Sequence, residues 1–62
     1  MQYYLKQSYD CDIQEIKSKD IIRHLKDKKL VEGQTVTIYS HMVLILKVIK
    51  VESNKIILKL ED

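Results

Sequence analysis

The sequence predicts an α+β fold, in which one helix packs on an antiparallel sheet of three or four strands that can curl into a small partial barrel. Three observations lead to this expectation. The segment 42–51 is rich in Ile, Leu and Val, as strands are. A second apolar run, 56–60, follows Ser53-Asn54, which is a candidate two-residue hairpin turn. The segment 19–29 instead has helical periodicity.

The length of the chain predicts a single domain, 1–62, with a marginal core. The core of a chain of 62 residues is marginal without help from disulfides, a metal or association, and a well-packed core is the other source of stability. Cys11 is the only cysteine and cannot form an intrachain disulfide. Cys11, His24 and His41 lack the paired spacing of a zinc site. We therefore expect no metal and no cofactor, and we expect association with another chain to contribute stability.

The composition is that of a folded protein with a weakly basic charge. A hydrophobic content of 45% argues against disorder, and the net charge is +2. The longest apolar run is 42–46, far short of the roughly 20 residues that cross a bilayer. No apolar stretch of the signal-peptide type begins the chain. We expect a cytoplasmic protein with no membrane partner.

The first third of the chain predicts one short strand, followed by a segment that is irregular or forms a second short strand. Residues 2–6 favour a strand, because tyrosines suit a pleated, half-buried surface. In 7–17 the signal is mixed. Tyr9, Cys11 and Ile13 alternate as in a strand, whereas neighbouring acidic residues could cap a helical turn.

The helix is expected to begin at Lys19 and to end near Lys29. Ser18 can act as its N-cap, and Asp20 lies in the first turn, where the helix dipole favours a negative charge. At about 100° per residue, one narrow stripe faces the core. It consists of Ile21, Ile22 and Leu25.

The remaining residues predict a strand within 31–38 and then a long hairpin. Pairing across Ser53-Asn54 places Val51 opposite Ile56 and Ile49 opposite Leu58. Lys47 then falls on the apolar side, and a β-bulge near it would turn it outward and bend the strand. The expected buried core is Ile21, Leu25, Val36, Ile38, Ile49, Val51, Ile56 and Leu58.

The same register leaves a second apolar strip on the opposite face of the hairpin. Its members are Leu44, Leu46, Val48 and Ile57. One interpretation is a homodimer interface or a docking site for another protein, because sizeable exposed apolar patches mark interaction sites. The other is that the N-terminal strand or the helix covers the strip, or that the sheet curls over it.

Two further groups of residues are candidate binding surfaces. Tyr3, Tyr4 and Tyr9 could form a contact surface for a protein or for bases, or they could cap the core. Lys19, Arg23, Lys26 and Lys29 could contact the phosphates of a nucleic acid, or they could form an ordinary solvated helix face.

Nothing in the sequence predicts catalysis. Cys11, His24 and His41 could include a nucleophile and a base, but no third residue orients them. There is no Gly-rich phosphate loop and no paired-carboxylate motif. We expect no enzymatic activity and no small-molecule substrate.

The second half of the chain loosely resembles small SH3-like and Sm-like barrels. The residues that carry the resemblance are Val-Glu-Gly-Gln-Thr-Val-Thr-Ile at 31–38, the long strand after it, and Lys-Ile-Ile-Leu-Lys-Leu at 55–60. The glycines of the bent Sm-like strand are absent, so no RNA-binding residues are carried over and no family is identified.

Two functional hypotheses follow. The first is a non-enzymatic protein-interaction module, such as a small inhibitor, adaptor or regulator that docks through its sheet or its tyrosines, on a partner or on a second copy. The second is a small nucleic-acid-binding regulator that uses the basic helix face. Salt dependence separates them, because phosphate binding weakens steeply with salt.

Overall fold

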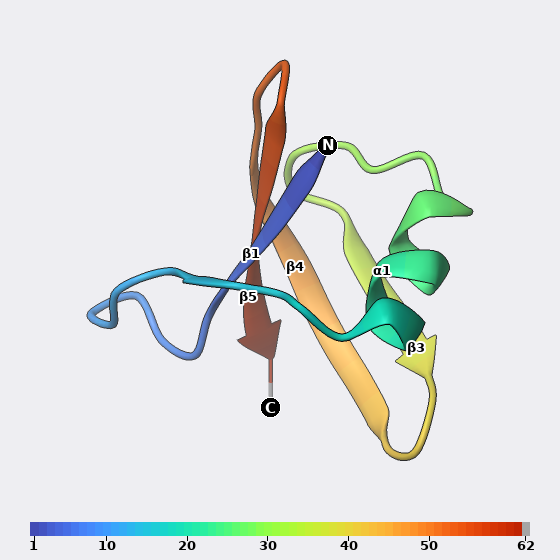
Figure 1. Ribbon diagram of the computed structural model, residues 1–62. Helices are drawn as coiled ribbons and strands as arrows, with labels where there is room; N and C mark the ends of the chain where they lie inside the picture. The colour runs from blue at the N-terminus through green and yellow to red at the C-terminus, as the bar shows by residue number, and fades with distance from the viewer. Residues whose placement is uncertain (62) are drawn as a thin grey trace.

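The computed structural model describes residues 1–61, which form one helix and a five-stranded mixed sheet (Figure 1). The strand order in the sheet is β2-β1-β5-β4-β3. In chain order the elements are β1 (Gln2–Lys6), β2 (Gln14–Glu15), α1 (Lys19–Lys26), β3 (Thr35–Tyr39), β4 (Val43–Val51) and β5 (Lys55–Glu61).

The α+β class is confirmed, but the expected antiparallel sheet of three or four strands is wrong. β3, β4 and β5 form the expected antiparallel meander. β1 then pairs with β5 in the parallel direction, with Tyr3 opposite Ile56 and Leu5 opposite Leu58. The two-residue β2 adds a fifth strand at the edge. Parallel pairing between the two ends of a chain has no local sequence signal, which is why the pattern alone did not predict it.

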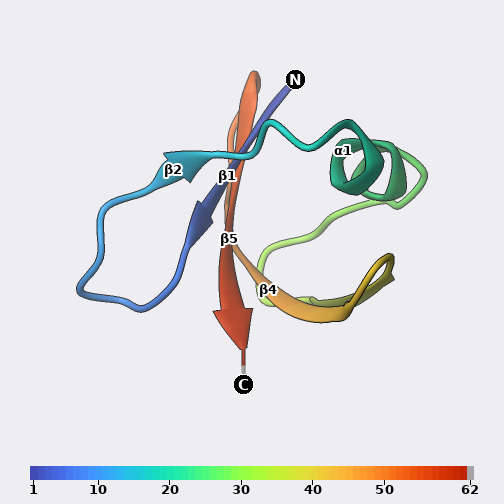
Figure 2. The same ribbon diagram turned by 60° about the horizontal axis from the view of Figure 1, so that its bottom comes forward.

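The sheet curls but does not close into a barrel. Its two edge strands are β2 and β3, and α1 connects them along the chain. Figure 2 shows the sheet bending from β5 through β4, with α1 on its concave side. On this side the helix packs Ile21, Ile22 and Leu25 against the core.

The helix α1 begins at the residue predicted from the sequence but ends earlier than predicted. Ser18 is the N-cap, and its Oγ accepts a hydrogen bond from the Ile21 N–H at 3.4 Å. The helix ends at Lys26, three residues before the expected end. The Lys28 N–H donates to the Leu25 carbonyl at 3.2 Å, an i to i−3 bond that tightens the last turn and ends the helix.

Gly33 allows the backbone to turn immediately before β3. The Gln34 N–H donates to the Val31 carbonyl at 3.0 Å, and Gly33 occupies the third position of this turn with φ +86°. Gly33 also donates to the Val48 carbonyl at 2.8 Å, while the Val48 N–H donates to Gln34 at 2.8 Å. Two residues opposite one, with a left-handed glycine first, make a G1 bulge.

A second bulge in β4 decides which of its residues face the core. Lys47 pairs with Lys59 and Val48 with Leu58, but Lys50 pairs with Ile57, so Ile49 is the extra residue. The predicted bulge exists, two positions closer to the hairpin turn than expected. Because strand side chains alternate, the extra residue at Ile49 inverts the facing of every earlier β4 residue relative to an unbroken ladder.

The core is consequently built from a different set of β4 residues. Ile49 is only half-buried and Val51 is exposed, so their expected burial was wrong, whereas Leu46 and Val48 are fully buried. Ile21 is half-buried against the core, and the other expected core residues are buried as predicted. The buried residues of the described chain are Tyr3, Ile16, Leu25, Val36, Ile38, Leu46, Val48, Ile56 and Leu58.

Candidate protein-docking surface

The apolar strip expected on the outer face of the hairpin does not exist as a surface. Leu46 and Val48 are 1% and 0% exposed, and Leu44 and Ile57 are half-buried. The bulge at Ile49 turns the β4 members of the strip inward, against the core. Of the two interpretations of the strip, the curled sheet and the helix favour the one in which it is covered.

Leu44 and Leu46 instead line a hollow at the open end of the curled sheet. The hollow holds about 210 Å³, and Gln14, Glu15 and Lys17 contribute to its rim. Its apolar lining also includes Leu5, Ile16, Ile21 and Leu60.

The exposed apolar residues that gather on one element belong to the β3–β4 hairpin. Tyr39 is 71% exposed and pairs with Val43, which is 58% exposed. Met42 lies in the turn between them at 65%, and Ile45, opposite Thr37, is 40% exposed. We call these four residues the hairpin patch. The sequence pattern did not predict this patch, because the expected register placed Leu44, Leu46 and Val48 on the outer face of β4.

The hairpin patch lies beside a sheet edge with unpaired backbone groups. Gln34 accepts from the Val48 N–H, and the Ser40 N–H donates to the Met42 carbonyl at 3.2 Å. The even-numbered residues between them therefore exchange hydrogen bonds with β4, because facing pairs alternate along an antiparallel ladder. The N–H and C=O groups of Thr35, Thr37 and Tyr39 point away from β4, and none of them has a backbone partner within residues 1–61.

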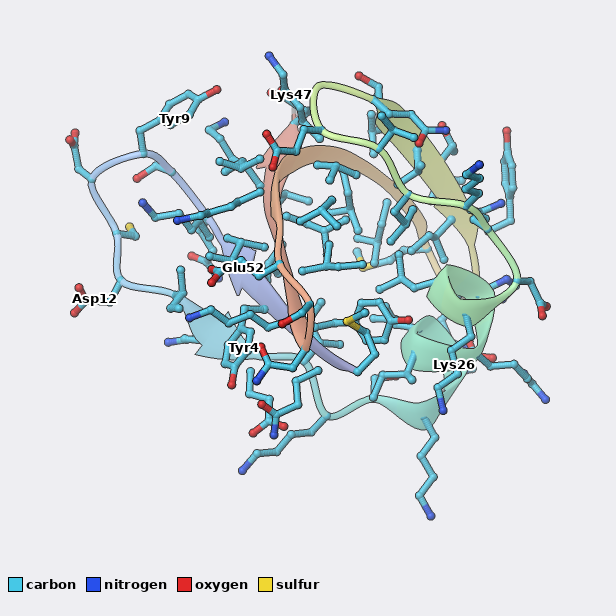
Figure 3. All side chains as sticks on the ribbon, turned by 90° about the horizontal axis from the view of Figure 1, so that it is seen from above. Tyr4, Tyr9, Asp12, Lys26, Lys47 and Glu52 are labelled. Carbon is cyan, nitrogen blue, oxygen red and sulfur yellow. The ribbon has the colours of Figure 1, made fainter. Side chains whose placement is uncertain are left out.

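The three N-terminal tyrosines do not form one surface. Tyr3 is buried in the core at 5% exposure. Tyr4 is half-buried on the outer face, where its hydroxyl donates to Gln2 Oε1 at 2.9 Å. Tyr9 is 62% exposed, and its ring centroid lies 4.8 Å from Lys59 Nζ, so the β1–β2 loop folds back towards the sheet. Figure 3 shows Tyr9 outside the curled sheet.

The basic residues of the helix are exposed, as expected for a solvated helix face. Lys19, Arg23 and Lys26 line a shallow hollow of about 430 Å³ on the surface of α1, and Lys29 lies beyond the end of the helix. Arg23 forms an ion pair with Asp20 at 2.9 Å. Hydrogen bonds to Asp20 from the Ser40 hydroxyl and then from Arg23 lower the pKa of its carboxyl group. Asp20 thereby ties α1 to the β3–β4 turn.

The residues with nucleophilic or metal-binding side chains lie on separate elements. Cys11 is exposed in the β1–β2 loop, where it accepts a hydrogen bond from Ser8. His24 lies on α1 with Nε2 3.9 Å from Asp20, and His41 is in the β3–β4 turn. Within residues 1–61 no three His, Cys, Asp or Glu side chains gather to hold a metal. No helix in this range is long and apolar enough to cross a membrane.

Comparison with known proteins does not assign this chain to a family. No family model matches the chain, and comparisons with curated proteins and with solved structures find no significant match. The geometry described above is therefore the basis for a functional proposal.

Proposed function

We propose that this chain is a non-enzymatic protein-interaction module that docks through the edge of β3, and that a second copy of the chain is its occupant. The observation that carries the proposal is the open β3 edge, where Thr35, Thr37 and Tyr39 have unpaired backbone groups beside the hairpin patch. An exposed edge of this kind is a template for strand addition.

A second copy fits the edge because the three outward residues are self-complementary. If two β3 strands pair antiparallel about a two-fold axis through Thr37, then Thr37 faces its own copy and Thr35 faces Tyr39 of the mate. Each facing pair can exchange two hydrogen bonds, about six in all. A two-fold interface of this type closes on itself and leaves no further edge for continued assembly at β3.

The magnitudes indicate a weak dimer. Six hydrogen bonds contribute about 0.5–1.5 kcal/mol each, and covering the exposed ring of Tyr39 contributes about 1–2 kcal/mol in each copy. Association costs about 4–15 kcal/mol in lost translational and rotational freedom. The most favourable limit of these ranges, about −9 kcal/mol, corresponds to a dissociation constant near the micromolar range, so the dimer is expected only at high protein concentration.

Sedimentation equilibrium from micromolar to millimolar concentration tests the proposal with two variants at one position. Thr37→Pro removes the outward N–H, and an edge strand tolerates proline where its N–H faces solvent. It should leave the monomer folded and abolish the dimer. The matched control, Thr37→Ala, removes the side chain but keeps the N–H and should dimerise like the wild type.

The hairpin patch provides a second comparison. Val43→Lys places a charge beside the paired edge, and Val31→Lys places one on an equally exposed valine in the α1–β3 loop, away from it. Val43→Lys should weaken the dimer more than Val31→Lys, because Val43 pairs with Tyr39 of β3 whereas Val31 precedes the strand. A wild type that stays monomeric at millimolar concentration, or a Thr37→Pro variant that dimerises normally, would contradict the proposal.

A further inference from the structure

Three lysines lie in register across three adjacent strands of the outer sheet face. Lys6 of β1 pairs with Lys59 of β5, and Lys59 pairs with Lys47 of β4. Each lysine follows a residue that packs in or against the core, namely Leu5, Leu46 or Leu58, so the lysine side chains lie on the face away from the core. Neighbouring strands are about 4.8 Å apart, so this lysine row spans about 10 Å.

The lysine row is electrostatically unfavourable for the isolated fold. Like charges directly opposite each other on neighbouring strands destabilise a sheet. Within the described residues only Lys59 has a carboxylate nearby, with Glu61 Oε2 at 3.5 Å, whereas Lys6 and Lys47 form no ion pair. A bound anion would relieve the repulsion that these side chains leave uncompensated.

The surrounding face adds to the positive charge. The outward side chains of β1, β4, β5 and the hairpin turn include five lysines and two glutamates, a net charge of +3. These are Lys6, Lys47, Lys50, Lys55, Lys59, Glu52 and Glu61. Glu15 lies one strand further out, opposite Tyr4. The charge is therefore concentrated on the central strands.

Two tyrosines accompany the lysines on this face. Tyr9 lies over Lys59 with its ring 4.8 Å from the ammonium group, and the Lys6 ammonium donates to the Tyr9 carbonyl at 3.3 Å. Tyr4 contacts Lys55, whose Nζ lies 5.9 Å from the ring centroid. The loop thus holds an exposed aromatic ring beside the lysine row, and Figure 3 shows Lys47 and Tyr9 both outside the curled sheet.

We propose that this face binds single-stranded nucleic acid, with phosphates on the lysine row and a base stacked on Tyr9. Cationic side chains that follow a backbone, combined with aromatic rings that accept any base, are the usual features of such surfaces. A flexible single strand can follow the curl of the sheet, and its unpaired bases are free to stack on an exposed ring. This binding does not depend on β3 pairing, because β3 lies beyond β4 at the sheet edge.

The number of phosphate contacts predicts how steeply the binding affinity falls with salt concentration. Each phosphate neutralised on a single strand contributes about 0.7 to the slope of log affinity against log salt. The Lys59 side chain is only 13% exposed, and its ammonium group already donates to the Leu60 carbonyl at 3.1 Å and to Glu61. Lys6 and Lys47 are therefore the lysines expected to contact phosphates, and two contacts predict a slope of about −1.4. Replacing both should reduce its magnitude to near zero.

Fluorescence anisotropy with a labelled oligothymidylate tests the assignment. Lys6→Gln with Lys47→Gln should weaken binding at low salt by about tenfold or more and flatten the slope as above. The matched control is Lys26→Gln with Lys29→Gln, which removes the same charge from the far side of the molecule, where Figure 3 places Lys26. The control should change the affinity by less than about twofold.

Binding measurements with other ligands and a Tyr9 variant identify the ligand. Tyr9→Leu should weaken binding of the oligonucleotide several-fold and leave binding of inorganic polyphosphate unchanged. The proposal is overturned if the wild type fails to bind at low salt, or if the helix control weakens binding as much as the sheet variant. It is equally overturned if polyphosphate binds as tightly as the oligonucleotide, or if anionic phospholipid vesicles bind the lysine row and the oligonucleotide does not. Circular dichroism melting of each variant verifies that a loss of binding is not a loss of folding.

Discussion

Truncating Leu46 and Ile45 to alanine should separate the two faces of β4. Leu46 is 1% exposed, and in the register it lies between Val36 and Leu60, both of which face the core side. Leu46→Ala removes buried methyl groups beside an existing hollow, so we expect a loss of about 2–4 kcal/mol. Ile45 is 40% exposed, and Ile45→Ala should cost about 1 kcal/mol or less, mostly through lost strand propensity.

Urea unfolding followed by circular dichroism measures both losses under the same conditions. A domain of this length is stabilised by about 3–9 kcal/mol in total, so Leu46→Ala should shift the midpoint strongly or unfold the chain. Ile45→Ala is the matched control, because it is the neighbouring residue in the same strand. Equal losses, or a larger loss at Ile45, would show that the facing of β4 derived from the bulge at Ile49 is incorrect.

Four other variants have expected outcomes that follow from the structure. Gly33→Ala should destabilise the fold by about 1 kcal/mol in urea unfolding, because φ is +86° there although the space for a Cβ is open. Since folding lowers the pKa of Asp20, its carboxylate stabilises the fold above its ordinary pKa of 3.8, and this contribution is lost as pH falls through the lower folded value. Ser40→Ala should raise the pKa of Asp20 towards 3.8 in an NMR titration, and Asp20→Asn should reduce the acid sensitivity of unfolding. Lys47→Gln should raise the melting temperature at low salt and less so at high salt, because it removes a like-charge neighbour of Lys59.

Local signals in the sequence predicted the elements that depend on neighbouring residues. Ser18 caps α1 as expected, because an N-cap needs only a hydroxyl and the following backbone N–H groups. The hairpin turn at Ser53-Asn54 is also confirmed, with the Glu52 N–H donating to the Lys55 carbonyl at 2.8 Å and Val51 opposite Ile56.

The facing of β4 and the pairing of β1 could not be predicted in the same way. The apolar run on both sides of Lys47 permits a bulge at several positions, and only packing of Leu46 and Val48 against the core selects Ile49. The parallel pairing of β1 with β5 joins residues that are more than fifty positions apart, so no short pattern reports it. The candidate site was affected most, because the hairpin patch and the lysine row both depend on these two features.

Amide hydrogen exchange at Thr37, measured by NMR across a dilution series, tests the docking proposal most directly. In dilute protein the Thr37 N–H should exchange rapidly, because it points away from β4 and has no partner, while the Val36 N–H should be protected within the ladder. At millimolar concentration the Thr37 N–H should become protected as two β3 strands pair. Rapid exchange of Thr37 at every concentration would contradict pairing with a second copy, and protection in dilute protein would contradict the open edge itself.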